Sequence, residues 1–131
     1  MKTKILWSSA LAAGVLVMSA ASSRLAAGQA DIENGKMVFE QCASCHTVDG
    51  SESDGPGLQG MFGRKAGSLE NYRFSAAMSR SDIVWDAMTL DKFLTDPQAS
   101  IPGNKMAFAG IEDAKFRADL IAYLEDATKK K

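Results

Sequence analysis

Apolar residues recur at helical spacing in three parts of the chain, which predicts three main helices and an all-α fold. The first helix is expected over Asp31 to Ala43, the second over Thr89 to Asp96, and the third from Asp113 to about Thr128. Pro97 directly follows the second segment, so that helix is expected to end there. The pattern is clearest in the third segment, whose apolar positions are Phe116, Leu120, Tyr123 and Leu124.

The segments between these helices have the composition of loops. Residues 48–67 contain six glycines and Pro56, and residues 101–110 read IPGNKMAFAG. No strand pattern alternates with the helical segments, and no internal repeat occurs. Residues 31–131 are therefore expected to form a single helical domain with long loops.

The first thirty residues have the order of a secretory leader. Lys2 and Lys4 precede an apolar run from Ile5 to Met18, and a small-residue stretch, SAASSRLAAGQA, follows. Ala21, Ala27 and Ala30 each end a plausible cleavage site. The alternative is a retained membrane anchor, but the run is at the short edge of the roughly 17–25 residues that span a bilayer. Residues 1–30 are predicted to be a signal peptide and the protein to be exported to the periplasm.

Removal of the leader makes the chain acidic. Residues 31–131 keep 12 basic residues against 16 acidic ones, a formal net charge of −4. A small acidic protein is a poor candidate for nucleic-acid binding. A domain of this size also buries a modest share of its surface, so a cofactor in its core would help it to fold.

Cys42 and Cys45 are the only cysteines, and His46 is the only histidine. A structural zinc site needs four ligands, and no second pair of ligands exists. A thioredoxin-like dithiol normally follows a strand in an alternating strand and helix pattern, which is missing here. A structural disulfide is allowed in an exported protein but leaves His46 unexplained.

Haem attachment accounts for all three residues, because C-x-x-C-H is the signature of c-type haem. In a helical turn, positions i, i+3 and i+4 lie on one face. Cys42 and Cys45 can then bond to the two vinyl groups of one porphyrin, while His46 points at the iron. Export agrees with this interpretation, since haem is attached covalently outside the cytoplasm in bacteria.

The second axial position of the iron separates an electron carrier from an enzyme. With no second histidine, the candidates are methionine, lysine or no protein ligand. Methionine is a common core filler, but Met106 lies in the irregular segment IPGNKMAFAG, where a loop could bring its sulfur to the iron. A haem enzyme or sensor with an open distal site remains the alternative.

The segments GKMVFEQCASCHT, GPGLQGMFGRKAG, IVWDAMTLDKFLTDP, IPGNKMAFAGI and RADLIAYLEDATK occur in this order. In them the chain resembles the class I cytochromes c, close to the mitochondrial protein and its bacterial relatives. The resemblance covers most of residues 31–131 and implies one cytochrome c domain there. It further implies three main helices, short helices and long loops around one covalently bound haem c.

The resemblance also implies roles for individual residues. His46 matches the proximal iron ligand and Met106 the distal sulfur ligand. Pro56 matches a proline whose carbonyl accepts the ring N–H of His46, a bond that fixes the orientation of the ring. Three further residues match positions that hydrogen-bond or screen a haem propionate: Arg64, Tyr72 and Trp85.

A class I cytochrome c is a one-electron carrier and not an enzyme. The resemblance implies a cytochrome bc complex or a periplasmic dehydrogenase as donor, and a terminal oxidase or a photosynthetic reaction centre as acceptor. The protein would be a monomer that meets the membrane only through partner complexes. Mitochondrial members dock through a ring of lysines, whereas this chain is acidic, so partner identity does not carry over.

Overall fold

The computed structural model describes residues 28–51 and 53–130. Within them the chain is helical, with one isolated antiparallel bridge between Lys65 and Val84. Three longer helices and two short ones follow one another, which confirms the predicted all-α fold. They are α1 (Ile32–Phe39), α2 (Ala76–Arg80), α3 (Ala87–Thr95), α4 (Pro97–Ser100) and α5 (Ala114–Ala127).

The last predicted helix is confirmed, whereas the first is shorter than the pattern predicts. Asp113 caps the N-terminus of α5, and its carboxylate accepts hydrogen bonds from two backbone N–H groups. Helix α1 ends at Phe39 rather than Ala43. Beyond it the Cys42 N–H donates to the Phe39 carbonyl at 2.7 Å, an i to i+3 bond that tightens the chain into successive turns.

The second predicted helix differs from the structure at its start, and an additional short helix follows it. Helix α3 begins two residues earlier than expected because Asp86 and Thr89 form a capping box. Pro97 follows the end of α3, as predicted, but it also occupies the first turn of α4, a short helix that the apolar pattern does not predict. Proline suits this position because the first turn of a helix does not need its N–H.

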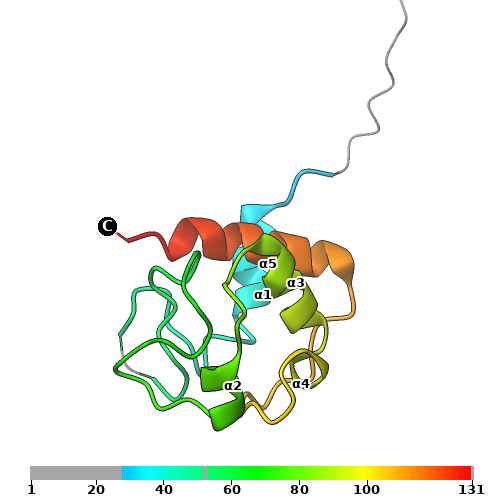
Figure 1. Ribbon diagram of the computed structural model, residues 1–131. Helices are drawn as coiled ribbons and strands as arrows, with labels where there is room; N and C mark the ends of the chain where they lie inside the picture. The colour runs from blue at the N-terminus through cyan, green and yellow to red at the C-terminus, as the bar shows by residue number, and fades with distance from the viewer. Residues whose placement is uncertain (1–27, 52, 131) are drawn as a thin grey trace, which may run out of the picture.

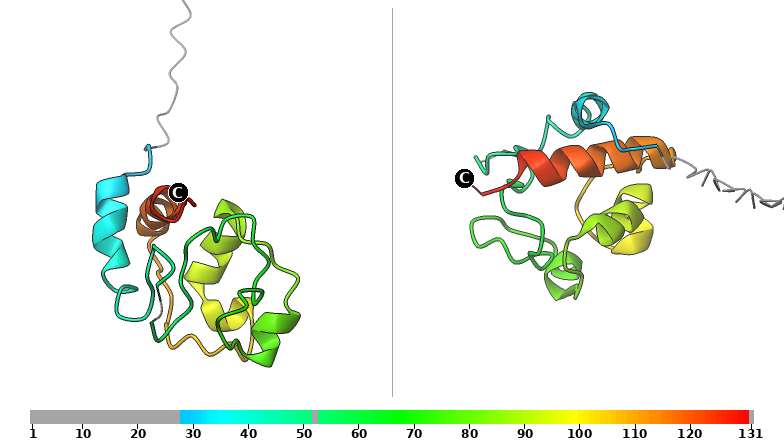
Figure 2. Two further views of the ribbon diagram at one scale, coloured as in Figure 1. Left: turned by 90° about the vertical axis from the view of Figure 1, so that its left-hand side faces the viewer. Right: turned by 90° about the horizontal axis from the view of Figure 1, so that it is seen from above.

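Helices α1 and α5 cross in close contact, and α2, α3 and α4 lie on the other side of the molecule (Figures 1 and 2). Gly35 makes the crossing possible, since a Cβ there would collide with the backbone carbonyl of Asp119. The rings of Phe39 and Tyr123 pack across the helices with centroids 5.5 Å apart. The two ends of the domain therefore hold each other in place.

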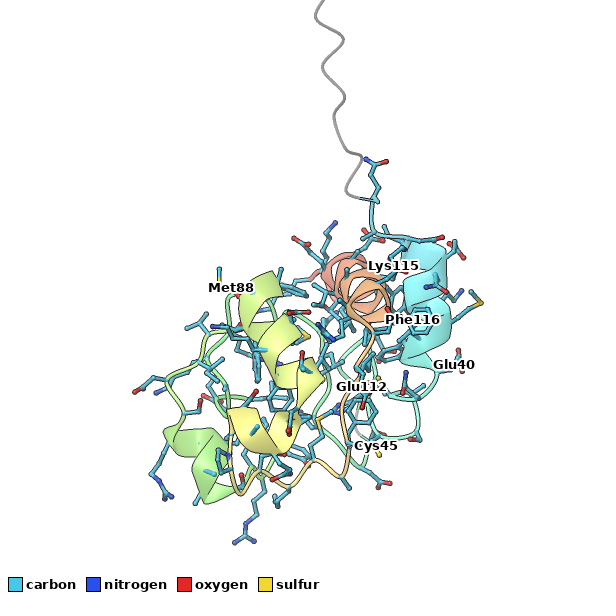
Figure 3. All side chains as sticks on the ribbon, turned by 90° about the vertical axis from the view of Figure 1, so that its right-hand side faces the viewer. Glu40, Cys45, Met88, Glu112, Lys115 and Phe116 are labelled. Carbon is cyan, nitrogen blue, oxygen red and sulfur yellow. The ribbon has the colours of Figure 1, made fainter. Side chains whose placement is uncertain are left out.

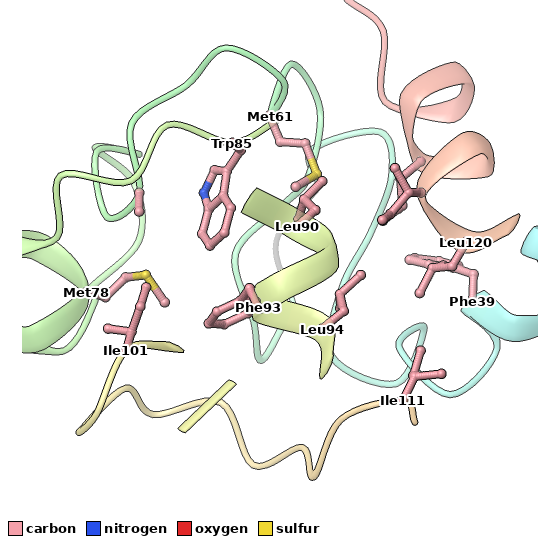
Figure 4. Packing of buried hydrophobic residues seen from close by; sticks show 13 residues of the cluster. Phe39, Met61, Met78, Trp85, Leu90, Phe93, Leu94, Ile101, Ile111 and Leu120 are labelled. Carbon is pink, nitrogen blue, oxygen red and sulfur yellow. The ribbon is translucent and has the colours of Figure 1, made fainter. Parts of the chain in front are cut away.

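The buried side chains come from all parts of the described chain. Leu120 of α5 and Phe39 of α1 lie at one end of the cluster, Met78 and Ile101 lie at the other, and Trp85 and Phe93 pack edge to face between them (Figure 4). Long loops complete the wall between them. The predicted signal peptide lies almost entirely outside the described residues, which begin at Gly28. No helix in residues 28–51 or 53–130 is long and apolar enough to cross a membrane.

Candidate cofactor site

A largely apolar cavity of about 400 Å³ opens between the helices and the loops. Cofactor pockets in proteins typically have volumes of roughly 300–1,000 Å³. The lining comes from residues far apart in the sequence, from Phe39 near the end of α1 to Leu124 in α5. Its large apolar side chains include Phe39, Met61, Phe74, Trp85, Phe93 and Leu120.

Cys42, Cys45 and His46 share one wall of this cavity. The N–H groups of Cys45 and His46 both donate to the Cys42 carbonyl, at 3.0 and 2.9 Å, so the three residues form one helical turn. Cys42 is half-buried, and Cys45 is exposed at the surface (Figure 3). The turn gives both sulfurs and the imidazole access to the same space.

The ring of His46 is held by the loop that follows it. Its Nδ1 lies 2.9 Å from the carbonyl oxygen of Pro56, so a proton on Nδ1 is donated there and Nε2 is left as an electron-pair donor. The Gly55 N–H donates to the Cys45 carbonyl at 2.7 Å. A Cβ on Gly55 would lie 2.7 Å from both that oxygen and the His46 ring, so only glycine fits. No sequence pattern indicates this role of Gly55 beyond the richness of the loop in glycine.

The thiol of Cys42 is kept protonated. Burial, and to a smaller extent the neighbouring thiol of Cys45, raises the pKa of Cys42 to about 11. Reactive dithiols need a thiolate, which forms where the pKa of the thiol is lowered. No group of three or more His, Cys, Asp and Glu side chains in the described chain is arranged to hold a metal ion. Within the described chain the pair therefore lacks the further ligands of a four-ligand zinc site, and the raised pKa of Cys42 is unlike that of a reactive dithiol.

Met106 reaches the same cavity from the segment between α4 and α5. The Met106 N–H donates to Oδ1 of Asn104 at 2.8 Å, and Asn104 is buried and donates to the carbonyls of Pro97 and Ile101. Gln98 donates to the carbonyls of Asn104 and Met106. These side chains fix an irregular loop, and no sequence pattern singles out Gln98.

The three residues predicted to lie around a propionate are placed differently from one another. Tyr72 and Trp85 line the cavity, and the Tyr72 hydroxyl donates to the Asp54 carbonyl at 3.2 Å. Arg64 does not line it. The guanidinium of Arg64 is half-buried instead and donates to the carbonyls of Gln59 and Gly57, at 3.0 and 3.3 Å, while burial lowers its pKa.

The side chains of this site fit a c-type haem. Two thiols on one turn can form thioethers with vinyl groups, and an imidazole nitrogen and a thioether sulfur are both ligands that haem iron accepts. The apolar wall matches a flat, largely apolar ring system. A helical domain with these features belongs to the class of proteins that can bind haem covalently.

Comparisons with known proteins identify the family. A family model described as cytochrome c matches residues 32–128. The chain is 49% identical to a cytochrome c of Gibberella zeae over 102 residues, which cover 76% of this chain and 96% of that protein. It is 40% identical to a cytochrome c2 of Blastochloris viridis over 121 residues, 88% of this chain and 94% of the relative. The chain belongs to the cytochrome c family.

A solved structure agrees with this assignment. Cytochrome cH from Methylobacterium extorquens is 41% identical and superposes with a TM-score of 0.69, covering 72% of this chain and 97% of its own. The class I cytochrome c fold predicted from the sequence is thereby confirmed. Haem c, one group covalently attached, is the cofactor of this family, and the family consists of electron carriers rather than enzymes.

Proposed function

We propose that this protein is an exported, single-haem electron carrier in which His46 and Met106 are the two axial ligands of the iron. One observation carries the proposal. Two potential iron ligands that are distant in sequence line the same apolar cavity, together with both cysteines of the attachment motif. When bound, the haem supplies a one-electron ferric/ferrous couple.

The protein's own side chains would tune that couple. The Pro56 carbonyl accepts the Nδ1 proton of His46, which orients the ring and makes Nε2 a better donor. Met106 adds a soft, neutral sulfur, and histidine–methionine ligation raises the reduction potential. The apolar wall keeps water away and disfavours the more highly charged ferric state. With both axial positions taken, no position is left for a substrate.

Arg64, Tyr72 and Trp85 are proposed to surround the haem propionates. Trp85 and Tyr72 already line the cavity. Arg64 donates to the carbonyls of Gly57 and Gln59, on either side of Leu58, which lines the cavity, and its half-buried charge lacks a carboxylate partner among the described residues. A propionate on this side would provide one, either directly or through water.

The leader and the family together support a place in electron transport outside the cytoplasm. Residues 1–30 are proposed to be removed as a signal peptide, which leaves residues 31–131 as a monomeric periplasmic domain. A cytochrome bc complex or a periplasmic dehydrogenase would supply the electron, and a terminal oxidase or a photosynthetic reaction centre would accept it. Redox encounters use small, weak interfaces, which allow fast release.

Carbon monoxide binding to the reduced holoprotein at neutral pH tests the ligation. If Met106 occupies the sixth position, the visible spectrum should stay unchanged on mixing with carbon monoxide. Rapid formation of a carbon monoxide complex would instead show an open or displaceable site. That outcome would favour a haem enzyme or gas sensor over the carrier.

A further inference from the structure

In the described chain, the first backbone group that is tied to the folded domain is the N–H of Asp31. It donates to Oδ1 of Asp119 on α5 at 2.7 Å. Residues 28–30 are exposed, and a side chain at Gly28 would meet nothing within 4 Å. The boundary between free chain and packed domain therefore falls between Ala30 and Asp31.

The acceptor at this boundary is a fully buried carboxylate. The Asp119 side chain has 0% exposure, and Nζ of Lys115 lies 2.7 Å from both of its oxygens. Nδ2 of Asn34 donates to Oδ2 at 2.6 Å. Lys115, whose side chain is 54% exposed, reaches this carboxylate from the end of α5 that lies beside α1 (Figure 3). Among the described residues it is the one cation that pairs with Asp119.

Acidic groups outnumber cations around the start of α1. The Asp31 carboxylate caps the helix by accepting from the Asn34 N–H at 3.1 Å, and Glu33 lies in the first turn. With Asp119, these make three carboxylates, and of the three only Asp119 has a cation, Lys115, as an ion-pair partner among the described residues. A second cation placed at the Asp31 nitrogen would reduce this imbalance and would turn the existing hydrogen bond to the buried carboxylate into an ion pair.

Peptide cleavage can create that cation, and the sequence before Asp31 suits cleavage. Gly28 and Ala30 are small residues at the third and first positions before the Ala30–Asp31 bond, the pattern of a leader cleavage site. We propose that the leader is cut between Ala30 and Asp31, and that the new α-ammonium of Asp31 forms an ion pair with Asp119. This inference rests on the export proposed above.

The covalent step is a peptide hydrolysis by water, catalysed by a leader peptidase of the exporting cell. The bond between the Ala30 carbonyl carbon and the Asp31 nitrogen breaks, the hydroxyl of water adds to that carbon, and the amine of Asp31 takes up protons at neutral pH. The nitrogen that was a neutral N–H donor becomes an ammonium in the same place. Cleavage after Ala21 or Ala27 would leave that nitrogen in a peptide bond.

The mass of the exported holoprotein tests the position of the cut. The full-length gene, with its leader, is expressed in a bacterium that matures c-type cytochromes, and the periplasmic product is measured intact. The expected mass is that of residues 31–131 plus one haem. A product that begins at Ser22 or Gly28, or that retains the leader, would overturn the proposal, while the carbon monoxide test of the iron ligands would be unaffected.

The ion pair is tested with an extended chain that carries Gly-Ser inserted between Ala30 and Asp31. The insertion keeps the residues before the cut but returns the Asp31 nitrogen to a peptide bond. The unfolding equilibrium constant of this holoprotein should rise roughly fivefold, because the insertion replaces an ion pair between an ammonium and the Asp119 carboxylate by a hydrogen bond from a neutral N–H to the same carboxylate.

Two substitutions make this measurement specific for Asp119. The effect of the insertion should vanish in an Asp119→Asn background and persist in Asp126→Asn, which removes an exposed carboxylate of α5 that pairs with Lys129. An insertion with no effect in the parent protein, or with equal effects in both backgrounds, would contradict the ion pair.

Discussion

At the scale of single residues, the two proposed iron ligands are each held by a hydrogen bond to a nearby residue, Pro56 for His46 and Asn104 for Met106. His46 is fixed through its ring, whose Nδ1 lies 2.9 Å from the Pro56 carbonyl. Met106 is fixed through its N–H, which donates to buried Asn104. The thioether itself forms no strong hydrogen bond, so the position of its sulfur depends on the loop that Asn104 holds.

Replacing Met106 with alanine should lower the reduction potential and leave the haem attached. Loss of the sulfur removes a ligand that favours ferrous iron, and a tenfold change in that preference corresponds to roughly 60 mV for one electron. A spectroelectrochemical titration of Met106→Ala against the parent protein measures the shift. Met37→Ala is the matched control, because Met37 lies on α1 with 65% of its surface exposed. Equal potentials in Met106→Ala and the parent would exclude Met106 as a ligand.

At the scale of elements, α1 and α5 join through one buried carboxylate. Asp119 accepts hydrogen bonds from Lys115, Asp31 and Asn34, which bring together the start of α1 and the first turns of α5. These bonds, with that of Lys115 the strongest, lower the pKa of Asp119 to about 2 from an ordinary value of 3.8. The packing of α1 against α5 is therefore stabilised by the ionised form of Asp119.

Protonation of Asp119 should lower the free energy of unfolding of the holoprotein as the pH falls from about 4 to about 2. A carboxylate with a lowered folded-state pKa contributes its full stability above its unfolded-state pKa and loses it as pH falls through the folded-state value. Thermal midpoints measured from pH 5 to pH 2 should drop less steeply for Asp119→Asn than for the parent. Asp126→Asn should follow the parent, and identical slopes for all three proteins would contradict the assignment.

The elements also show what sequence patterns can and cannot predict. The predicted bounds of α5 are correct to within a residue at each end, because apolar periodicity, an N-terminal acid and terminal lysines agree. The predicted first helix runs four residues past the end of α1, since the turn of Cys42 to His46 has helical spacing without continuing the helix. The short helices α2 and α4 depend on caps and tertiary packing, which no apolar period reveals.

The same limit applies to the site. The motif identifies the cysteines and His46, while the loop context and the family resemblance identify Met106. Neither signal identifies Gly55 or Gln98, because their roles arise from close approach and from a loop conformation. Close approach at Gly55 and the loop conformation at Gln98 arise only when the chain has folded and distant segments are in contact.

At the scale of the whole molecule, the cofactor space is part of the core. The same apolar residues that line the cavity form the buried cluster, among them Trp85, Phe93 and Leu120. Without haem, these apolar side chains would face water across a cavity of about 400 Å³ instead of a bound ring system, and the stabilisation from burying them would be lost. A domain of about 100 residues has a net stability of only about 5–15 kcal/mol, so it tolerates little loss of apolar burial.

The chain without haem should therefore be largely unfolded. The test uses residues 31–131 with both cysteines replaced by alanine and no haem supplied, followed by far-ultraviolet circular dichroism on heating. The expected result is low helicity with no cooperative transition, while the holoprotein unfolds sharply. A cooperative transition in the haem-free chain would mean that the polypeptide core is sufficient by itself.

The central claim, that His46 and Met106 together ligate the iron of a one-electron carrier, is tested most directly by the absorption spectrum of the oxidised holoprotein. Sulfur ligation predicts a weak sulfur-to-iron charge-transfer band at neutral pH, which disappears on one-electron reduction and is missing from Met106→Ala. Absence of that band from the oxidised parent protein, or its persistence in Met106→Ala, would contradict the account.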